Sequence, residues 1–179
     1  MGDATAPVFW DGHWMQAPVA AMGGEALIVP NVAALVLREG TGELLLQRRD
    51  KPEVVRGLLE IPTGRWRAGE APWQALSREV AEETGLAVRS MTGEGKRLEV
   101  YPGRPVYVLQ PAAVVLGAGG AYPALLVAFT CVAEGEPRPL PGETADPRWY
   151  PVDEVRALLA HPEQFTAAAH AVLVAWLGA

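Results

Sequence analysis

The apolar positions of the chain gather in short runs separated by turn-forming residues, and this pattern predicts a sheet. Residues 27–37 are rich in Val, Leu and Ala and suit a buried strand. Residues 39–42 suit a turn, and residues 43–48 form the return strand of a hairpin. Gly and Pro separate four more runs that have the composition of strands. These further strands are predicted at residues 58–63, 87–101, 106–116 and 125–133.

Helical segments are predicted at three places. The first runs from Glu70 to Thr84 after a loop over residues 64–69, because Pro72 suits a first turn and Gly85 suits a helix end. An irregular, proline-rich loop follows the last strand. The loop spans residues 137–150, and the two later helices span residues 151–159 and 162–177. Strands combined with helices in this way indicate an α/β domain.

Three carboxylates lie on one side of the helix predicted over residues 70–84. Glu79, Glu82 and Glu83 have the spacing i, i+3 and i+4, so they share an arc beside the apolar stripe. A solvated acidic flank is one interpretation. However, acids near the end of a helix oppose its dipole and repel one another. Arg78 precedes Glu82 in the weaker order for an i, i+4 pair, so helix stabilisation alone does not explain the cluster. A hard cation such as Mg²⁺ or Mn²⁺ explains it better, and such ions commonly bridge to substrate phosphates.

Length and composition fit one domain over residues 26–179, preceded by an N-terminal arm or hairpin over residues 1–25. The Asp11-Gly12 pair suits a hairpin turn. Trp10 and Trp14 give this segment two large apolar side chains, which would bury well against another surface. A homodimer contact through the arm is one hypothesis, and packing of the arm on its own domain is the alternative.

The net charge of −6, with Lys and Arg scattered, makes a nucleic-acid polymer an unsuitable partner. The longest apolar tract, residues 165–177, is too short to span a bilayer, so no membrane association is expected. Cys131 lies in an apolar run and reads as a buried structural thiol, which fits a reducing, cytoplasmic setting. Arg48 and Arg49 end the first hairpin, where they could contact phosphate oxygens or be solvated.

The segment around the acidic helix resembles the Nudix hydrolase box, G-x5-E-x7-R-E-V-x-E-E-x-G-L. The matching residues are Gly64, Glu70, Arg78, Glu79, Val80, Glu82, Glu83, Gly85 and Leu86. The resemblance covers 23 of 179 residues. It implies a Nudix-type α/β/α sandwich with a mixed β-sheet between helices.

The resemblance also implies an enzyme that cleaves a pyrophosphate bond by water attack. Mg²⁺, with Mn²⁺ as an alternative, would be held by Glu79, Glu82 and Glu83, and Glu70 and the Gly64 carbonyl would complete its surroundings. Arg78 is assigned to orientation of these carboxylates. A catalytic base is expected either among the box glutamates, with Glu82 and Glu83 the main candidates, or in the late loop, where Glu143 is the candidate.

The implied substrate is a nucleotide-derived small molecule. The lead-in Glu60-Ile61-Pro62-Thr63-Gly64 and Pro102, 16 residues past the box, resemble ADP-ribose or nucleoside-diphosphate-sugar pyrophosphatases. Tyr101 stands near the position of a tyrosine in dinucleoside-polyphosphate hydrolases, so a substrate of that kind, or a nucleoside triphosphate, is the alternative. A non-catalytic nucleotide-sensing module ranks third. Tyr101, Tyr122 and Trp149 are the candidates for stacking on the base.

Overall fold

A computed structural model of the chain describes residues 5–10, 13–18, 28–51, 55–118 and 123–178. Its centre is an eight-stranded mixed sheet with the order β10-β11-β3-β4-β12. Strands β5, β6 and β7 pair with β4, β3 and β11 respectively. β3 and β11 are parallel, whereas the other pairs in this sheet are antiparallel. The strands of the central sheet are β3 (Val29–Arg38), β4 (Leu44–Arg49), β5 (Leu59–Glu60), β6 (Thr63–Arg65), β7 (Ala87–Thr92), β10 (Ala113–Gly117), β11 (Ala124–Glu134) and β12 (Thr144–Tyr150).

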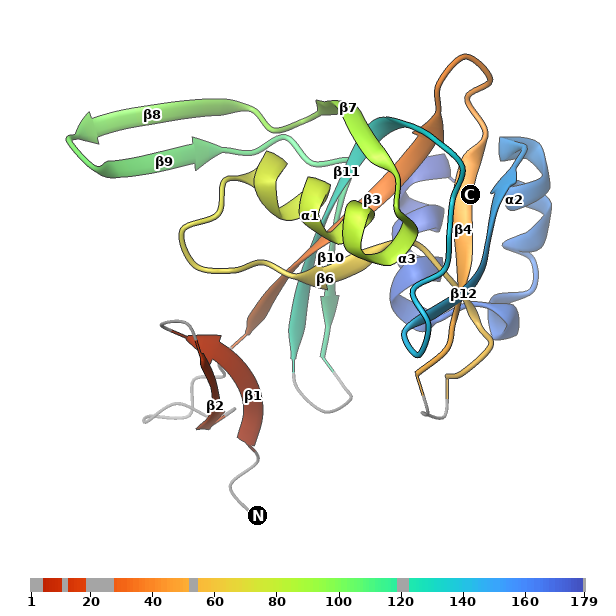
Figure 1. Cartoon of the computed structure of the whole chain (residues 1–179), viewed down its shortest axis with the longest axis horizontal. Helices are drawn as coiled ribbons and strands as arrows, with labels where there is room; N and C mark the ends of the chain where they lie inside the picture. The colour runs from red at the N-terminus through yellow and green to blue at the C-terminus, as the bar shows by residue number, and fades with distance from the viewer. Residues whose placement is uncertain (1–4, 11–12, 19–27, 52–54, 119–122, 179) are drawn as a thin grey trace.

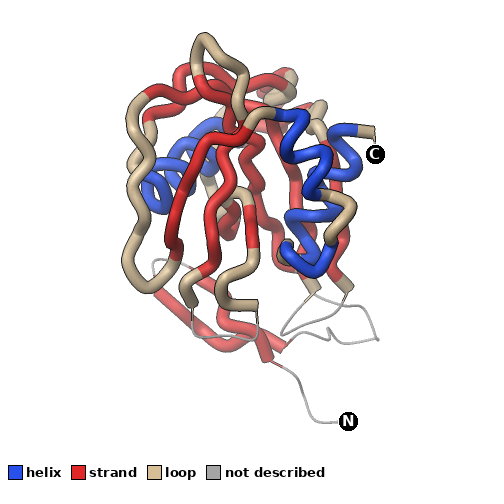
Figure 2. The backbone as a smooth tube through the Cα atoms, turned by 90° about the vertical axis from the view of Figure 1, so that its right-hand side faces the viewer, coloured by secondary structure: helices blue, strands red, loops and turns tan. Residues whose placement is uncertain are grey.

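Helices cover both faces of this sheet (Figures 1 and 2). α1 (Pro72–Thr84) packs on one face, and α2 (Val152–Leu158), the short 3₁₀ helix η1 (Pro162–Gln164) and α3 (Ala167–Leu177) lie over the other. Among the described residues, no helix has the length and apolar character needed to cross a membrane. The layers make an α/β/α sandwich with a mixed sheet, so the fold class predicted from the sequence is confirmed.

The central strand β3 contributes side chains to the hydrophobic clusters on both faces of the sheet. Val32, Ala34 and Val36 belong to the cluster beneath α1, whereas Ala33 and Leu35 belong to the cluster beneath α2 and α3. Successive side chains of a strand point to opposite faces, so a continuous apolar run suits a strand buried on both sides. The 27–37 run therefore has the character expected of a central strand.

Helix α1 begins two residues later than predicted, at Pro72. The reason is that Glu70 is used by the preceding loop, where its carboxylate accepts a hydrogen bond from the Arg67 amide at 3.0 Å. Its carbonyl accepts another from the Trp66 indole at 3.1 Å. The end of the helix agrees with the prediction, because Gly85 follows Thr84 with a left-handed φ of 69°.

Two strands predicted as continuous are each broken in two. The 87–101 segment forms β7 and β8 (Lys96–Tyr101), and the 106–116 segment forms the end of β9 (Arg104–Val108) and most of β10. Gly93 and Gly95, between β7 and β8, have positive φ, and a Cβ at either would overlap the carbonyl of Gln110 or Val108. Strands β8 and β9 therefore leave the central sheet as a separate two-stranded hairpin (Figure 1).

The C-terminal third differs from the prediction in two respects. Residues 144–150, predicted as irregular, form β12 against β4, with a register shift between Ala145 and Arg148. This shift absorbs Pro147, which has no amide hydrogen for a regular ladder. The helix predicted over 162–177 is interrupted by Phe165 and Thr166. Thr166 caps α3 by accepting a hydrogen bond from the Ala169 amide.

The N-terminal segment contains the antiparallel pair β1 (Thr5–Trp10) and β2 (His13–Pro18), which form their own two-stranded sheet. The turn predicted at Asp11-Gly12 and the stacking candidate Tyr122 lie outside the described residues. A contact within the same chain is present at Trp14, whose ring lies 4.1 Å from the Arg65 guanidinium carbon. The homodimer hypothesis for this arm stays a prediction.

Candidate active site

A cavity of about 590 Å³ opens where β6, α1 and the ends of several other strands meet. Its lining combines carboxylates from three parts of the chain with basic side chains. The acidic lining residues are Glu60, Glu79, Glu82, Glu83 and Glu143. The basic ones are Arg49, Lys51, Arg65 and Arg67. Such a mixture can hold both a cation and the negative groups of a phosphorylated ligand.

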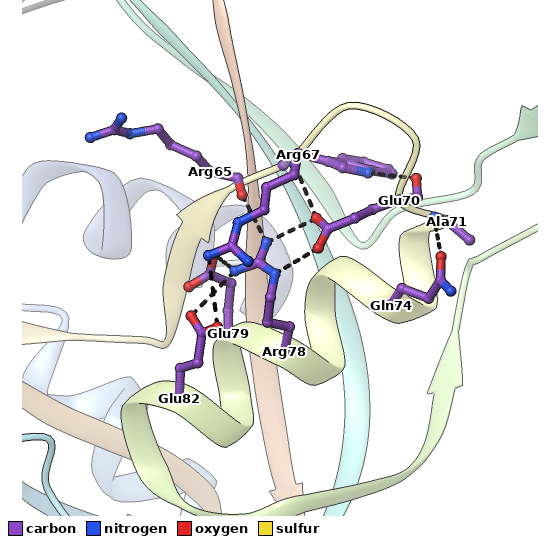
Figure 3. A network of polar contacts seen from close by, with 9 residues as sticks. Arg65, Arg67, Glu70, Ala71, Gln74, Arg78, Glu79 and Glu82 are labelled. Carbon is purple, nitrogen blue, oxygen red and sulfur yellow. Dashed lines mark hydrogen bonds and ion pairs between the residues drawn. The ribbon is translucent and has the colours of Figure 1, made fainter. Parts of the chain in front are cut away.

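Arg78 organises the polar contacts beside this cavity (Figure 3). Its guanidinium donates to both carboxylate oxygens of Glu70, at 2.6 and 2.9 Å, and to the Arg65 carbonyl at 3.0 Å. It also pairs with Glu79 and, at 3.4 Å, with Glu82. These contacts raise the pKa of Arg78, first through Glu70, and Arg78 in turn lowers the pKa of Glu70. Neither Arg78 nor Glu70 lines the cavity, so Arg78 acts by holding carboxylates that do, and Glu70 acts by holding Arg78.

Gly64 lies directly against Glu79. A Cβ added at Gly64 would overlap the Glu79 carboxylate, so only glycine allows this approach of β6 to α1. Glu79 is 8% exposed, and burial raises the pKa of its carboxyl despite the ion pair with Arg78. The box glycine and its second glutamate are thus packed together, although they are 15 residues apart in the chain.

Glu83 belongs to the same wall and is likewise 8% exposed. Its carboxylate accepts a hydrogen bond from the Gln47 side chain at 2.7 Å and one from the Thr63 amide at 3.3 Å. Burial raises the pKa of Glu83 to about 8, and the nearby charges of Glu60 and Glu79 add to this increase. Several acids therefore share a space in which a bound cation would relieve their mutual repulsion.

The late loop and the end of β4 complete the wall. Glu143 lines the cavity and pairs with Lys51, with 3.2 Å between carboxylate oxygen and ammonium nitrogen. The Asp50 amide donates to the Glu143 carbonyl at 2.8 Å, which anchors the loop beside β4. Arg49 also lines the cavity and pairs with Glu60 at 3.4 Å. The structure thus brings Glu143 and Arg49 to the box residues.

Three of the sequence-predicted residues lie elsewhere. Arg48 precedes Arg49 in β4 and points to the opposite face, where it donates to the Gly57 carbonyl at 2.8 Å. Tyr101 lies on the β8–β9 hairpin with 68% exposure and does not line the cavity. The other stacking candidate, Trp149, packs against the core cluster under α1, with Arg38 over its ring. None of the three is placed to contact a ligand in this cavity.

Several lining residues were missed by the sequence analysis as site residues. Glu60 lines the cavity, and Gln47, which does not line it, donates to Glu83; both approach Glu83 through the pairing of β4 with β5. Lys51, Arg65 and Arg67 carry no spacing signal. Glu60 was quoted only as part of the lead-in to the box, and its position at an apolar strand end was the one available clue, because an acid is rarely buried without a purpose.

The carboxylates suit a divalent cation in donor chemistry and location, because hard cations prefer oxygen ligands. Glu79, Glu82 and Glu83 all line the cavity, and the backbone of Gly64 lies against Glu79. Within the described part of the chain, no three acidic, His or Cys side chains already converge in a metal-binding arrangement. Arg78 pairs with Glu79 and Glu82, and Gln47 donates to Glu83, so each of the three carboxylates already has a polar partner.

Comparisons with known proteins bear on the family and the fold. The chain is 42% identical over 55 residues to an 8-oxo-dGTP diphosphatase of Haemophilus influenzae, a stretch covering 31% of this chain and 40% of that relative's length. The fold is similar to the MutT NUDIX hydrolase of Burkholderia pseudomallei, with 21% identity, a TM-score of 0.60 and coverage of 82% of this chain and 96% of that one.

It is also similar to the NUDIX domain of Shewanella oneidensis NrtR, solved in complex with ADP ribose. That pair has 16% identity and a TM-score of 0.53 over 76% of this chain and 81% of the other. A family model described as the NUDIX domain matches residues 28–177, which is most of this chain. The chain therefore belongs to the NUDIX family.

Proposed function

We propose that this protein is a divalent-metal-dependent pyrophosphohydrolase of a nucleoside diphosphate linked to a second moiety, such as ADP-ribose or a nucleotide sugar. The observation that carries the proposal is the cavity that Glu79, Glu82 and Glu83 line together with four basic residues, here called the basic rim: Arg49, Lys51, Arg65 and Arg67. Acids to hold a cation and basic groups to bind phosphates are the two requirements for hydrolysis of a phosphoric anhydride.

A bound Mg²⁺, or Mn²⁺ in its place, supplies positive charge at the phosphate oxygens and lowers the pKa of water. Glu79, Glu82 and Glu83 would hold it, with the Gly64 carbonyl nearby. Arg78 keeps Glu79 and Glu82 in place, and Glu70 in turn fixes Arg78. The three carboxylates and Arg78 all belong to α1, and Gly64 brings the backbone of β6 against Glu79.

The basic rim binds and orients the substrate. Arg49, Lys51 and Arg67 line the cavity close to the carboxylates and can donate to anionic phosphate oxygens. Glu143 is the proposed acceptor of a proton from the attacking water, and its support is that its carboxylate lines the cavity and is 45% exposed. Glu82, with 47% side-chain exposure, is the alternative base.

A nucleoside triphosphate substrate is the second candidate. It is supported by the 42% identity over 55 residues to an 8-oxo-dGTP diphosphatase. The first candidate is supported by the lead-in to the box and by the fold it shares with a domain solved with ADP ribose. Specificity within a shared fold depends on the residues around the cavity, so activity measurements must decide.

The deciding experiment is a substrate panel with Mg²⁺: ADP-ribose, nucleotide sugars, dinucleoside polyphosphates, and ordinary and oxidised nucleoside triphosphates. Released mononucleotide, phosphate and pyrophosphate identify the bond cleaved. The wild type is compared with Glu82→Gln and with Glu154→Gln, an exposed glutamate on α2 that serves as the matched control.

Turnover of ADP-ribose or a sugar nucleotide, lost in Glu82→Gln and kept in Glu154→Gln, would support the first candidate. Turnover restricted to triphosphates or dinucleoside polyphosphates would move the assignment to the alternative substrates. Tight binding of a nucleotide without turnover of any compound would instead favour a nucleotide-sensing module. Equal activity in Glu82→Gln and the wild type would contradict the role given to the acidic cluster.

A further inference from the structure

Trp14 stands at the rim of the catalytic cavity although it belongs to the N-terminal hairpin. It is a lining residue of the cavity and is 58% exposed. The Arg65 guanidinium carbon lies over its ring, 4.1 Å from the ring centroid. A cation over an aromatic face is attracted by the ring quadrupole, which helps to fix the ring at this position.

Arg65 ties the indole to the catalytic residues. Its carbonyl accepts a hydrogen bond from Arg78 at 3.0 Å, and Gly64, the preceding residue, lies against Glu79. Its guanidinium points away from the box carboxylates (Figure 3). In the short strand β6, Gly64 therefore contacts Glu79 and the next residue, Arg65, contacts the Trp14 ring.

A substrate with a nucleobase needs a flat partner close to its phosphates. Among the described residues that line the cavity, Trp14 is the aromatic one. Stacking of a base on an aromatic side chain tolerates different bases, because every base has a π-face. The basic rim that includes Arg65 and Arg67 leads from the carboxylates towards this indole, as a nucleotide with its phosphates at the metal side would require.

We propose that Trp14, supported by Arg65, is the stacking platform for the substrate's nucleobase. This inference rests on the proposed function and adds the base-binding residue to it. The N-terminal hairpin thus completes the cavity of its own chain and contributes to substrate affinity. Trp14 touches the base and takes no part in the hydrolytic step.

The test compares Trp14→Ala, Trp14→Phe and Met15→Ala in the full-length chain. Met15 is the matched control because it is the next residue of β2, is exposed, points to the other face and does not line the cavity. With the best nucleotide substrate of the panel, Trp14→Ala should raise KM about 5- to 150-fold, the range expected for loss of one base-stacking contact. Its kcat should stay within about twofold of the wild-type value, since binding and not chemistry is changed.

Trp14→Phe should recover most of the affinity, and Met15→Ala should leave KM and kcat unchanged. A KM for Trp14→Ala equal to that of Met15→Ala would overturn the proposal. So would a fall in kcat at unchanged KM, because that result would place Trp14 in the chemistry or the fold.

Calorimetry with AMP and with ribose 5-phosphate separates this inference from the proposed function, because it needs no turnover. At least fivefold weaker binding of AMP to Trp14→Ala, with ribose 5-phosphate bound as by the wild type, would support the platform even for a chain that hydrolyses nothing. Equal AMP binding by the wild type and Trp14→Ala, or no AMP binding by the wild type, would overturn it.

Discussion

The two longest helices of the protein lie on opposite faces of one sheet and bury different kinds of residue. α3 places Ala169, Val172 and Leu173 in the core and carries no Asp, Glu, Lys or Arg over residues 167–177. α1 also has an apolar side, but it buries Glu79 and Glu83 next to that side. Burying these carboxyls costs stability, as the raised pKa values of both groups show.

This difference separates a helix that serves the fold from one that carries the residues of the proposed chemistry. The α3 face gains stability from each buried side chain. The α1 face keeps destabilising groups where a cation and a phosphate can use them, as is common where stability is traded for activity. Changes at the acidic positions of α1 should therefore reduce activity with little loss of stability, and changes at the buried positions of α3 should do the reverse.

The largest expected effect on activity comes from Glu83→Gln. Loss of a carboxylate proposed to hold the ion should lower kcat/KM by about 10²-fold or more, the order seen when a charge-stabilising group is removed from an active site. The unfolding midpoint of the metal-free variant at pH 8 should equal or exceed that of the wild type, because the neutral amide avoids the buried charge. Activity near the wild-type level, or a large loss of stability, would break the contrast between the helices.

Leu173→Ala should have the largest effect on stability. Truncation of a fully buried leucine removes apolar contacts and leaves a cavity, so the free energy of unfolding should fall by about 2–5 kcal/mol. Denaturant unfolding measures the loss, and Ala175→Ser, at an exposed position on the same helix, is the control. In the folded fraction, KM and the Mg²⁺ concentration for half-maximal activity should be unchanged. A change in either would link α3 to the site.

Arg78→Lys sharpens the assignment of α1 by separating position from charge. Lysine keeps the charge but cannot reproduce the fork that binds Glu70, Glu79 and the Arg65 carbonyl at once. The Mg²⁺ concentration for half-maximal activity should rise about 10- to 100-fold, as for other residues that orient metal ligands. Arg156→Lys, on α2, is the control. Activity that excess Mg²⁺ does not restore, in a folded variant, would favour a direct catalytic role for Arg78.

The expected effect that develops most gradually is a pH-dependent difference in stability. The pKa of Glu83, about 8, exceeds its ordinary value of 4.5, so between these values the native state binds more protons than the unfolded state. The stability contributed by protonated Glu83 is complete below about pH 4.5 and is lost as pH rises towards 8.

The thermal midpoint of the metal-free wild type should therefore fall relative to that of Glu83→Gln between pH 5 and 8. The difference between the two proteins in free energy of unfolding can change by at most about 1.4 kcal/mol per pH unit. Scanning fluorimetry in the presence of a chelator measures it. Parallel pH profiles for the two proteins would show that Glu83 titrates normally.

Much of α1 was predictable because its determinants are local. The apolar spacing, Pro72 and the Gly85 end are all within the segment, and the helix differs from the prediction only at its start. The box spacing likewise indicated the family, which the match over residues 28–177 confirms. The breaks at Gly93 and Gly95 were not predictable, since the carbonyls that require glycine there lie 13 or more residues further along the chain.

By itself, the sequence determined the acidic helix, its glycine turn and the arginine that precedes the first of the three clustered glutamates, because these residues interact over one to eight positions or share one helical face. Only the tertiary structure decided which side chains surround them. Gln47 reaches Glu83 across 36 residues, and Trp14 reaches Arg65 from a separate hairpin. The tertiary structure also distinguished two adjacent arginines: Arg49 lines the cavity, whereas Arg48 does not. Such long-range contacts depend on strand order and register, which local periodicity does not encode.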